Sequence, residues 1–224
     1  VELAWFQSYL SDRKQFVFFN GKCSSLSEIL LGVPQGSILG PLLFLIYINQ
    51  LPLVSSLLSS LFADDTMLLA SGPDITELSN FVNTEFHKVN QFFRTHKLAL
   101  HPNKTQFLLF TSSLAARENP PLIYINNSDI GAPPDPTKLI LIPNVNIASE
   151  VPAVKFLGIF IDPLLNFKYH IGKLSKKLAT SLYFMRSAKN FLTLNARKSM
   201  YYSLFHSVLI YGIHLWSSAC LLYT

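Results

Sequence analysis

Cysteine is scarce in this sequence, and the two cysteines present are not spaced for shared chemistry. Cys23 and Cys220 lie far apart, with no CxxC pair and no spacing typical of metal ligands. This pattern excludes a disulfide-stapled scaffold and favours a reducing compartment with free thiols. The chain also begins without a methionine and without a secretory signal pattern. We therefore expect an intracellular protein, nuclear or cytoplasmic, of which this sequence is a fragment.

Long apolar runs are also missing. No charged residue occurs between Ile29 and Ala63, or between Met200 and Thr224. The longest unbroken apolar block in the first stretch, Leu42–Ile48, is much shorter than the ~20 residues that a membrane span needs. We therefore expect no membrane partner, and we interpret both uncharged stretches as buried core elements.

Acidic residues are absent after Asp162. Residues 163–224 contain eight basic residues: Lys168, Lys173, Lys176, Lys177, Arg186, Lys189, Arg197 and Lys198. The preceding 162 residues carry a net charge of −3. A basic region of one sign indicates a polyanionic partner, either nucleic acid or an anionic membrane surface. The alternative is an ordinary solvated helix face rich in lysine.

The hydrophobic pattern predicts an α+β fold. Leu78, Val82, Phe86, Val89 and Phe93 recur every three or four residues, which predicts an amphipathic helix over Ile75–Thr95. Helices are also predicted at Glu2–Leu10, after Ser37 through Leu42–Ile48, from Tyr169 onward and at Asn195–Leu209. The second of these is apolar nearly all round, so we expect it to be buried on most sides. Strands are predicted at Gln15–Phe19, turning at Asn20-Gly21, at Gln106–Phe110, and at Val154–Ile161, where Gly158 breaks the strand.

Two regions are expected. Residues 1–162 form the α+β part, with a loop-rich, proline-rich excursion near 115–151 that holds strand candidates at Leu122–Ile125 and Leu139–Ile142. Residues 163–224 form the basic helical part, in which Ile171, Leu174, Leu178, Leu182 and Met185 share one helix face.

Two adjacent carboxylates, Asp64 and Asp65, lie between short apolar runs within Ser60–Ala70. This pattern predicts a strand, a tight turn and a second strand, with buried strands and two negative charges at the tip. Adjacent carboxylates repel each other unless a cation lies between them, and Mg²⁺ prefers such hard oxygen ligands. The alternative is a solvated turn with a chance pair of aspartates.

Six segments in this order carry a family resemblance: Trp5–Arg13, Gly32–Pro41, Phe62–Asp65, Asn103–Thr105, Lys155–Ile159 and Tyr211–Trp216. Together they resemble the reverse transcriptase of non-LTR (LINE-type) retrotransposons over nearly the whole chain. The most specific combination is PQGS followed by LGP and then by FADD. The resemblance implies a partial right-hand polymerase palm with a helical, thumb-like C-terminal part.

The resemblance also implies roles for single residues. Asp64 and Asp65 would be catalytic and would bind Mg²⁺ in a two-metal polymerase site. Lys104 would be a catalytic residue that meets the triphosphate or protonates the pyrophosphate. Pro34, Gln35, Gly36 and Phe62 would lie near the template and the incoming nucleotide. Phe156, Leu157 and Gly158 would form the primer grip, and Lys173, Lys176 and Lys177 would contact nucleic-acid phosphates.

Each of these roles has a simpler alternative. Gln35 would be a polar residue at a helix start, and Lys104 an exposed lysine in a turn. Phe156–Gly158 would be part of a core strand with a bulge glycine.

The family's third catalytic aspartate, on a strand upstream of the helix at Glu2, has no counterpart here. We therefore predict a fragment of an RNA-directed DNA polymerase that is inactive alone, with RNA template, DNA primer, deoxynucleoside triphosphates and the rest of a parent protein as partners. The alternatives are a non-catalytic remnant that binds RNA or an RNA–DNA hybrid, and a retrotransposon relic without selected function.

Overall fold

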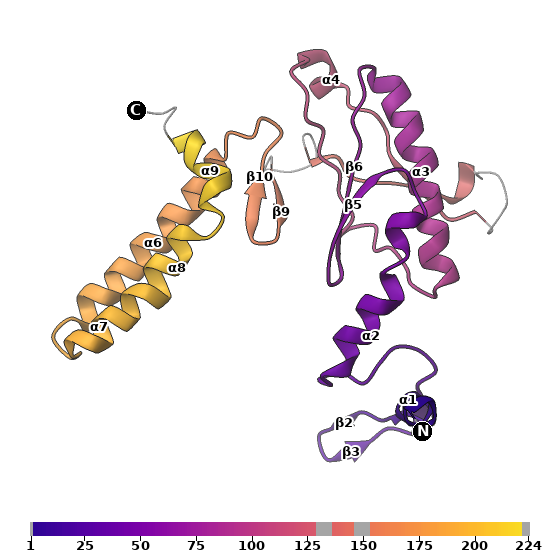
Figure 1. Ribbon diagram of the computed structural model, residues 1–224, viewed down its shortest axis with the longest axis horizontal. Coiled ribbons are helices and arrows are strands. Elements are labelled where there is room, and N and C mark those ends of the chain that lie inside the picture. Colours follow the sequence, from indigo (N-terminus) through magenta and orange to yellow (C-terminus); the bar gives the residue numbers. More distant parts are fainter. Residues whose placement is uncertain (1, 129–135, 146–152, 221–224) are drawn as a thin grey trace. The chain divides into compact units, whose positions relative to one another are not determined.

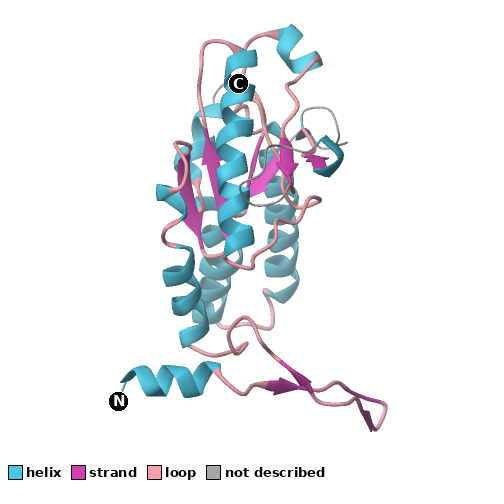
Figure 2. Ribbon diagram, turned by 90° about the vertical axis from the view of Figure 1, so that its right-hand side faces the viewer, coloured by secondary structure: helices cyan, strands magenta, loops and turns pink. Residues whose placement is uncertain are grey.

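The computed structural model describes residues 2–128, 136–145 and 153–220, with side chains for all of these except Pro136 and residues 218–220 (Figure 1). The chain forms two compact units, one ending at Ala70 and the other beginning at Ser71. Both contain helices, and each named strand pairs with a single neighbour in a two-stranded sheet (Figure 2). The mixed helix and strand content confirms the α+β class, whereas the palm, the thumb and the division at Asp162 stay predictions.

The first unit begins with helix α1 (Glu2–Leu10), as predicted. Two short antiparallel pairs follow, β1 (Lys14–Gln15) with β4 (Ser27–Glu28) and β2 (Phe18–Phe19) with β3 (Lys22–Cys23). Asn20 and Gly21 form the predicted turn, with φ angles of 48° and 74°. The single strand predicted over Gln15–Phe19 is wrong, because its two halves pair with different segments.

Helix α2 (Leu39–Ile48) begins after Ser37, as predicted, and Ser37 Oγ accepts a hydrogen bond from the Gly40 N–H at 3.0 Å. The expected burial is wrong. Only Gly40 and Ile48 are buried, and the exposed side chains include Leu42, Leu45 and Ile46. The neighbouring described elements are the 3₁₀ turn η1 (Leu51–Leu53) and two-stranded sheets, which are too small to cover a ten-residue helix.

The strand–turn–strand prediction around the aspartate pair is confirmed. Strand β5 (Leu58–Phe62) pairs antiparallel with β6 (Asp65–Leu69). The predicted burial of these strands is wrong, because exposed and half-buried residues alternate along both of them. The rest of the unit can cover at most one face of this two-stranded sheet, so the other face remains open to solvent.

Helix α3 (Ile75–Thr95) has the predicted bounds and opens the helical part of the second unit. The Asp74 side chain caps it by accepting hydrogen bonds from the N–H groups of Thr76 and Glu77, both at 2.8 Å. Phe86, Val89 and Phe93 of the predicted apolar face are buried, as periodicity requires.

Polar side chains of α3 hold part of the proline-rich excursion. The excursion forms the short helix α4 (Leu114–Glu118), strand β7 (Tyr124–Asn126), the 3₁₀ turn η2 (Pro136–Lys138) and strand β8 (Leu139–Leu141). Strands β7 and β8 pair antiparallel, which confirms both strand candidates, while residues 129–135 and 146–152 of the excursion lie outside the described residues. Asn83 Nδ2 donates to Leu122 O at 2.9 Å, and buried Asn90 donates to Asn126 O at 2.5 Å.

The strand predicted at Gln106–Phe110 is wrong. Among the described residues this segment forms no named strand, and its one β-bridge is the isolated parallel bridge between Phe107 and Asn144. The opposing segment contains Pro143, which accepts the Phe107 N–H through its carbonyl but has no N–H of its own to continue a ladder.

The remainder of the second unit is a hairpin followed by helices (Figure 1). The hairpin pairs β9 (Val154–Phe156) with β10 (Ile159–Ile161). The strand predicted over Val154–Ile161 is broken at Gly158 as expected, and the chain turns back at Leu157-Gly158. The helices are α6 (Lys168–Ala188), α7 (Leu194–Tyr201), the π-helical turn η3 (Tyr202–His206), α8 (Ser207–Ile210) and α9 (Ile213–Cys220). Elements α7 to α8 correspond to the predicted helix Asn195–Leu209.

Ile159, Phe167 and Trp216 form the small core that joins this hairpin to the helices. Ile171 and Leu174, from the predicted apolar face of α6, pack against it, whereas Leu182 of that face is exposed. The prediction that the uncharged stretch from Met200 is buried is wrong for most described side chains. Trp216 is buried there, but Tyr201, Tyr202, Leu204, Ile210, Tyr211 and Leu215 are exposed. None of the helices within the described ranges combines the length and the apolar character that a membrane span requires.

Replacing Asn90 with alanine tests the attachment of β7 to α3. The variant leaves the carbonyl of Asn126 without its buried donor, so we expect the free energy of unfolding to fall by about 1–3 kcal/mol. Asn80→Ala on the exposed side of the same helix is the matched control and should change it by less than about 0.5 kcal/mol. Urea unfolding measures both, and equal losses in the two variants would contradict the proposed attachment.

Candidate functional site

The β5–β6 hairpin presents both aspartates to solvent. Asp64 lies in the two-residue turn, and Asp65 is the first residue of β6, opposite Phe62. Ala63 adopts a left-handed conformation with φ of 52°, which is uncommon for a residue other than glycine. Within the described parts of the chain, neither carboxylate has a hydrogen bond or an ion pair. The turn therefore leaves the oxygens of both side chains available to an external ligand.

One face of this hairpin combines carboxylate and apolar groups. Directly opposed residues share a face, so Asp65 lies on the same side as Phe62, and the pairs Ser60–Met67 and Leu58–Leu69 continue that face. Leu58, Phe62, Met67 and Leu69 are all exposed. The aspartate pair thus borders an uncovered apolar strip.

The donor chemistry of Asp64 and Asp65 fits Mg²⁺, which binds one or two carboxylates and completes its six ligands with water and phosphate oxygens. Among the described residues no group of three or more His, Cys, Asp or Glu side chains converges on a metal position. The two aspartates can therefore contribute to a metal site, but no third His, Cys, Asp or Glu side chain joins them in the part of the chain that the structure describes.

The Pro34–Gly36 loop precedes α2. Pro34 O accepts a hydrogen bond from Ser37 Oγ at 2.8 Å, and Gly36 has a φ of 79° that suits glycine. Gln35 is exposed, so its amide is accessible. Ser37 Oγ also accepts the Gly40 N–H, so these two hydrogen bonds link the loop to α2 and not to the aspartate hairpin.

Lys104 lies in the predicted turn, where its N–H donates to His101 O at 3.0 Å. Its side chain is exposed, and it belongs to the second unit, whereas Asp64 and Asp65 belong to the first. Its encounter with a triphosphate at the aspartate pair stays a prediction.

The predicted primer grip is the turn of the β9–β10 hairpin. Leu157 and Gly158 have φ angles of 44° and 85°, so Gly158 lies in a tight turn and not in a strand bulge. Tyr211 covers this turn: its hydroxyl donates to Leu157 O at 2.5 Å, and a Cβ at Gly158 would lie 3.3 Å from its ring. The absence of a side chain at Gly158 permits that close contact.

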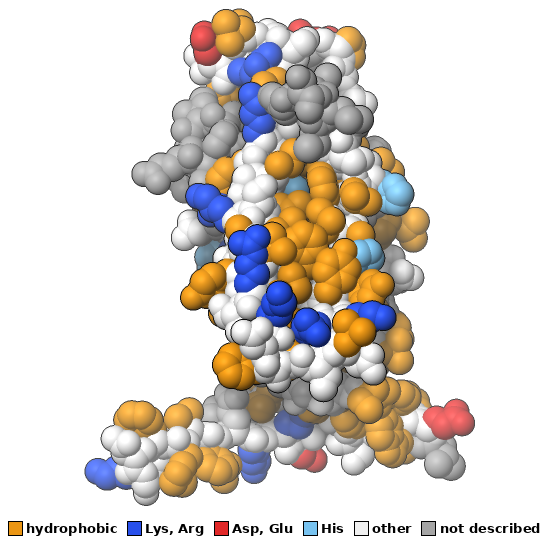
Figure 3. Space-filling model, turned by 90° about the vertical axis from the view of Figure 1, so that its left-hand side faces the viewer, with side chains coloured by type: hydrophobic (Ala, Val, Ile, Leu, Met, Phe, Trp, Pro, Cys, Tyr) orange, Lys and Arg blue, Asp and Glu red, His pale blue; other side chains and the backbone are white. Residues whose placement is uncertain are grey.

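A pocket of about 520 Å³ lies between this hairpin and the helices α6 and α8. Three residues predicted to meet nucleic acid line this pocket together: Gly158 from the hairpin turn, and Lys173 and Lys177 from α6. Lys176 does not line it. Figure 3 shows Lys and Arg side chains bordering an apolar surface over the helical region.

His170 is the member of this pocket that sequence reasoning missed. It lies three and seven residues before Lys173 and Lys177, a spacing that places all three on one helix face. The ring is buried, and its Nδ1 accepts the Phe160 N–H at 3.4 Å. Burial lowers the pKa of His170 below its usual value, because desolvation penalises the charged imidazolium.

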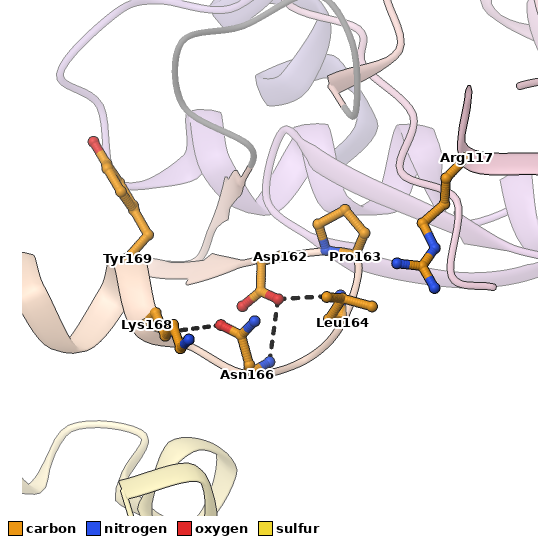
Figure 4. A pocket seen from close by; sticks show the side chains of 7 residues that line it. All are labelled: Arg117, Asp162, Pro163, Leu164, Asn166, Lys168 and Tyr169. Atoms are coloured by element: carbon orange, nitrogen blue, oxygen red, sulfur yellow. Dashed lines mark hydrogen bonds between the residues drawn. The ribbon is translucent and has the colours of Figure 1, made fainter. Parts of the chain in front are cut away.

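A second pocket, also of about 520 Å³, lies beside the start of α6 (Figure 4). Its acidic group is buried Asp162, whose carboxylate accepts the N–H groups of Leu164, Asn166 and Phe167 at 3.1, 3.1 and 2.6 Å. These bonds fold the loop that leads into α6. The carboxylate therefore shapes the chain locally, and it is already satisfied without a ligand.

Comparison with known proteins identifies the class. Residues 1–161 match the family described as reverse transcriptase (RNA-dependent DNA polymerase), and the chain belongs to that family. This confirms the resemblance that its six motifs indicate.

The relatives come from insect retrotransposons. The probable RNA-directed DNA polymerase from transposon X-element of Drosophila melanogaster is 25% identical, over 96% of this chain and 22% of that protein. The RNA-directed DNA polymerase from mobile element jockey of the same species is 23% identical, over 95% and 22%. The Pol polyprotein from retrotransposable element R1 of Bradysia coprophila is 25% identical, over 96% and 20%. The chain spans about a fifth of the length of these relatives, and no solved structure matches it significantly.

The lowered pKa of His170 predicts how stability depends on pH. Between that lowered pKa and the usual value of 6.5, the unfolded chain binds more protons than the folded chain, so the free energy of unfolding falls as pH drops through this window. His87, whose pKa is lowered by burial and by the charge of Arg94, adds to the same trend. In urea unfolding across this range, His170→Asn should flatten the slope, and His170→Asn with His87→Asn should flatten it further. An unchanged slope in both variants would contradict the assignment.

Proposed function

We propose that this chain is the palm and thumb part of a LINE-type RNA-directed DNA polymerase that works within a longer protein. The observation that carries the proposal is the tight β5–β6 turn, which exposes Asp64 and Asp65 without protein partners in the described residues. Membership of the reverse transcriptase family supports it. The substrates would be an RNA template, a DNA primer and deoxynucleoside triphosphates, in the nucleus or the cytoplasm.

The residues take separate tasks in this proposal. Asp64 and Asp65 would hold Mg²⁺, which when bound would activate the primer hydroxyl and stabilise the leaving pyrophosphate. Lys104 provides a positive charge for the triphosphate. The site residues of the first unit that meet template or nucleotide are Pro34, Gln35, Gly36 and Phe62. Those of the second unit that hold the primer and its phosphates are Phe156, Leu157, Gly158, Lys173, Lys176 and Lys177.

A non-catalytic role in holding RNA or an RNA–DNA hybrid is the second candidate. The pocket with Lys173 and Lys177 favours it, because a basic pocket can bind phosphates without a complete metal site. The third candidate is a retrotransposon relic, in which neither catalysis nor nucleic-acid binding is under selection. An interrupted reading frame upstream of this sequence would favour the relic.

Primer extension by the longer protein that carries this sequence tests the catalytic role. We expect Asp64→Asn to reduce Mg²⁺-dependent DNA synthesis about 1000-fold, since a metal ligand contributes several kcal/mol of transition-state stabilisation. Asp12→Asn removes another exposed carboxylate of the same unit and should retain full synthesis. Equal activity of the two variants would refute the assignment of Asp64.

The same assay on the 224-residue chain alone tests whether two aspartates suffice. We expect no measurable extension, because the metal site lacks a third carboxylate among the described residues. Synthesis by the chain alone that disappears in Asp64→Asn would show this expectation to be wrong.

A further inference from the structure

The turn of the β9–β10 hairpin lacks the residue pair that most readily forms it. Leu157 and Gly158 are its two central residues, and both have positive φ angles, 44° and 85°, as a type I′ turn requires. Asn-Gly is the favoured pair for this turn. The β2–β3 hairpin of the same chain uses that pair, with φ angles of 48° at Asn20 and 74° at Gly21. A leucine in this conformation costs free energy, so the rest of the structure must stabilise the β9–β10 turn.

Tyr211 supplies this stabilisation from the link between α8 and α9. The Leu157 side chain is exposed, so its own packing contributes little. The Tyr211 hydroxyl donates a hydrogen bond to Leu157 O at 2.5 Å, and the Tyr211 ring lies against Gly158. Since Leu157 O belongs to the peptide between the two turn residues, this hydrogen bond favours one orientation of that peptide.

Two neighbouring residues fix the position of Tyr211 in turn. Buried Trp216 donates its Nε1–H to Tyr211 O at 3.1 Å. Gly212 lies so close to Ile159, the first residue of β10, that a Cβ at Gly212 would displace the Ile159 side chain. Ile159 and Trp216 also share the small core that joins the hairpin to the helices. The segment Tyr211–Trp216, which has no task among the polymerase roles given above, therefore connects the turn to that core.

We propose that Tyr211 is a positioning residue that fixes the Leu157–Gly158 turn in the conformation that holds the primer. The inference rests on the proposed function, in which this turn belongs to the part of the chain that holds the primer. It goes beyond that function by naming the residue that sets the conformation of the turn. Because leucine stands where asparagine would form the turn unaided, the turn keeps its conformation only while Tyr211 contacts it.

Steady-state primer extension by the longer protein that carries this sequence tests the positioning role. Tyr211→Phe removes the hydroxyl and keeps the ring. We expect KM for the primer–template to rise about 5-fold and kcat to change less than about 2-fold, because the aspartate hairpin is untouched. Tyr183→Phe removes the hydroxyl of an exposed tyrosine of α6 and, as the matched control, should leave both constants unchanged. A fall in kcat alone, or an unchanged KM in Tyr211→Phe, would overturn the proposal.

A rescue experiment on the 224-residue chain tests whether the hydroxyl acts through the turn. The nuclear Overhauser effect between the amide and α protons of residue 157 is strong at positive φ and weak at negative φ. We expect Tyr211→Phe to weaken this signal. Adding Leu157→Asn to Tyr211→Phe should restore it, because Asn-Gly forms the turn without the hydrogen bond. A signal that Tyr211→Phe leaves unchanged, or that Leu157→Asn does not restore, would contradict the role of the hydroxyl.

These experiments separate the positioning role from the polymerase role. The nuclear Overhauser measurement needs neither Mg²⁺ nor nucleic acid, so its failure contradicts the role of Tyr211 and not the proposed function. Unimpaired synthesis in Asp64→Asn contradicts the polymerase role and has no bearing on the conformation of the turn. A turn that changes in Tyr211→Phe while KM for the primer–template stays constant would show that the turn does not hold the primer.

Discussion

The apolar contact among Ile159, Phe167 and Trp216 holds the β9–β10 hairpin against α6 and α9. The basic pocket depends on this contact, because its lysines come from both sides of it. Gly212, with φ of 63°, lies directly against Ile159, where a larger side chain would separate hairpin and helix. A small core of this kind contributes only a few kcal/mol, yet it positions every charge that faces the pocket.

Local sequence signals were sufficient to predict secondary structure wherever a segment's structure depends on that segment alone. The apolar period and the Asp74 cap define α3, and the glycine after Asn20 defines the first hairpin turn. The aspartate hairpin was predictable for the same reason, since its strands are neighbours in sequence. The adjacent carboxylates alone suggested a cation, but a turn with two aspartates has several possible uses, so the proposed metal role depends mainly on the motif resemblance.

The errors arose where structure depends on partners distant in sequence. Apolar composition predicted that α2 is buried, but burial needs neighbours, and the described first unit offers few. The strand at Gln106–Phe110 failed because its partner segment contains Pro143. His170 escaped notice because an isolated histidine on a helix carries no signal. Its meaning arises only when the hairpin brings the Phe160 N–H to Nδ1.

The central claim is that Asp64 and Asp65 hold the divalent metal of a polymerase. Replacing Mg²⁺ with Fe²⁺ in the longer protein bound to primer–template, and adding peroxide, cuts the backbone close to the bound metal. We predict cleavage between Phe62 and Thr66 that excess Mg²⁺ suppresses and that Asp64→Asn abolishes. Cleavage confined to other segments, with this hairpin intact, would contradict the account.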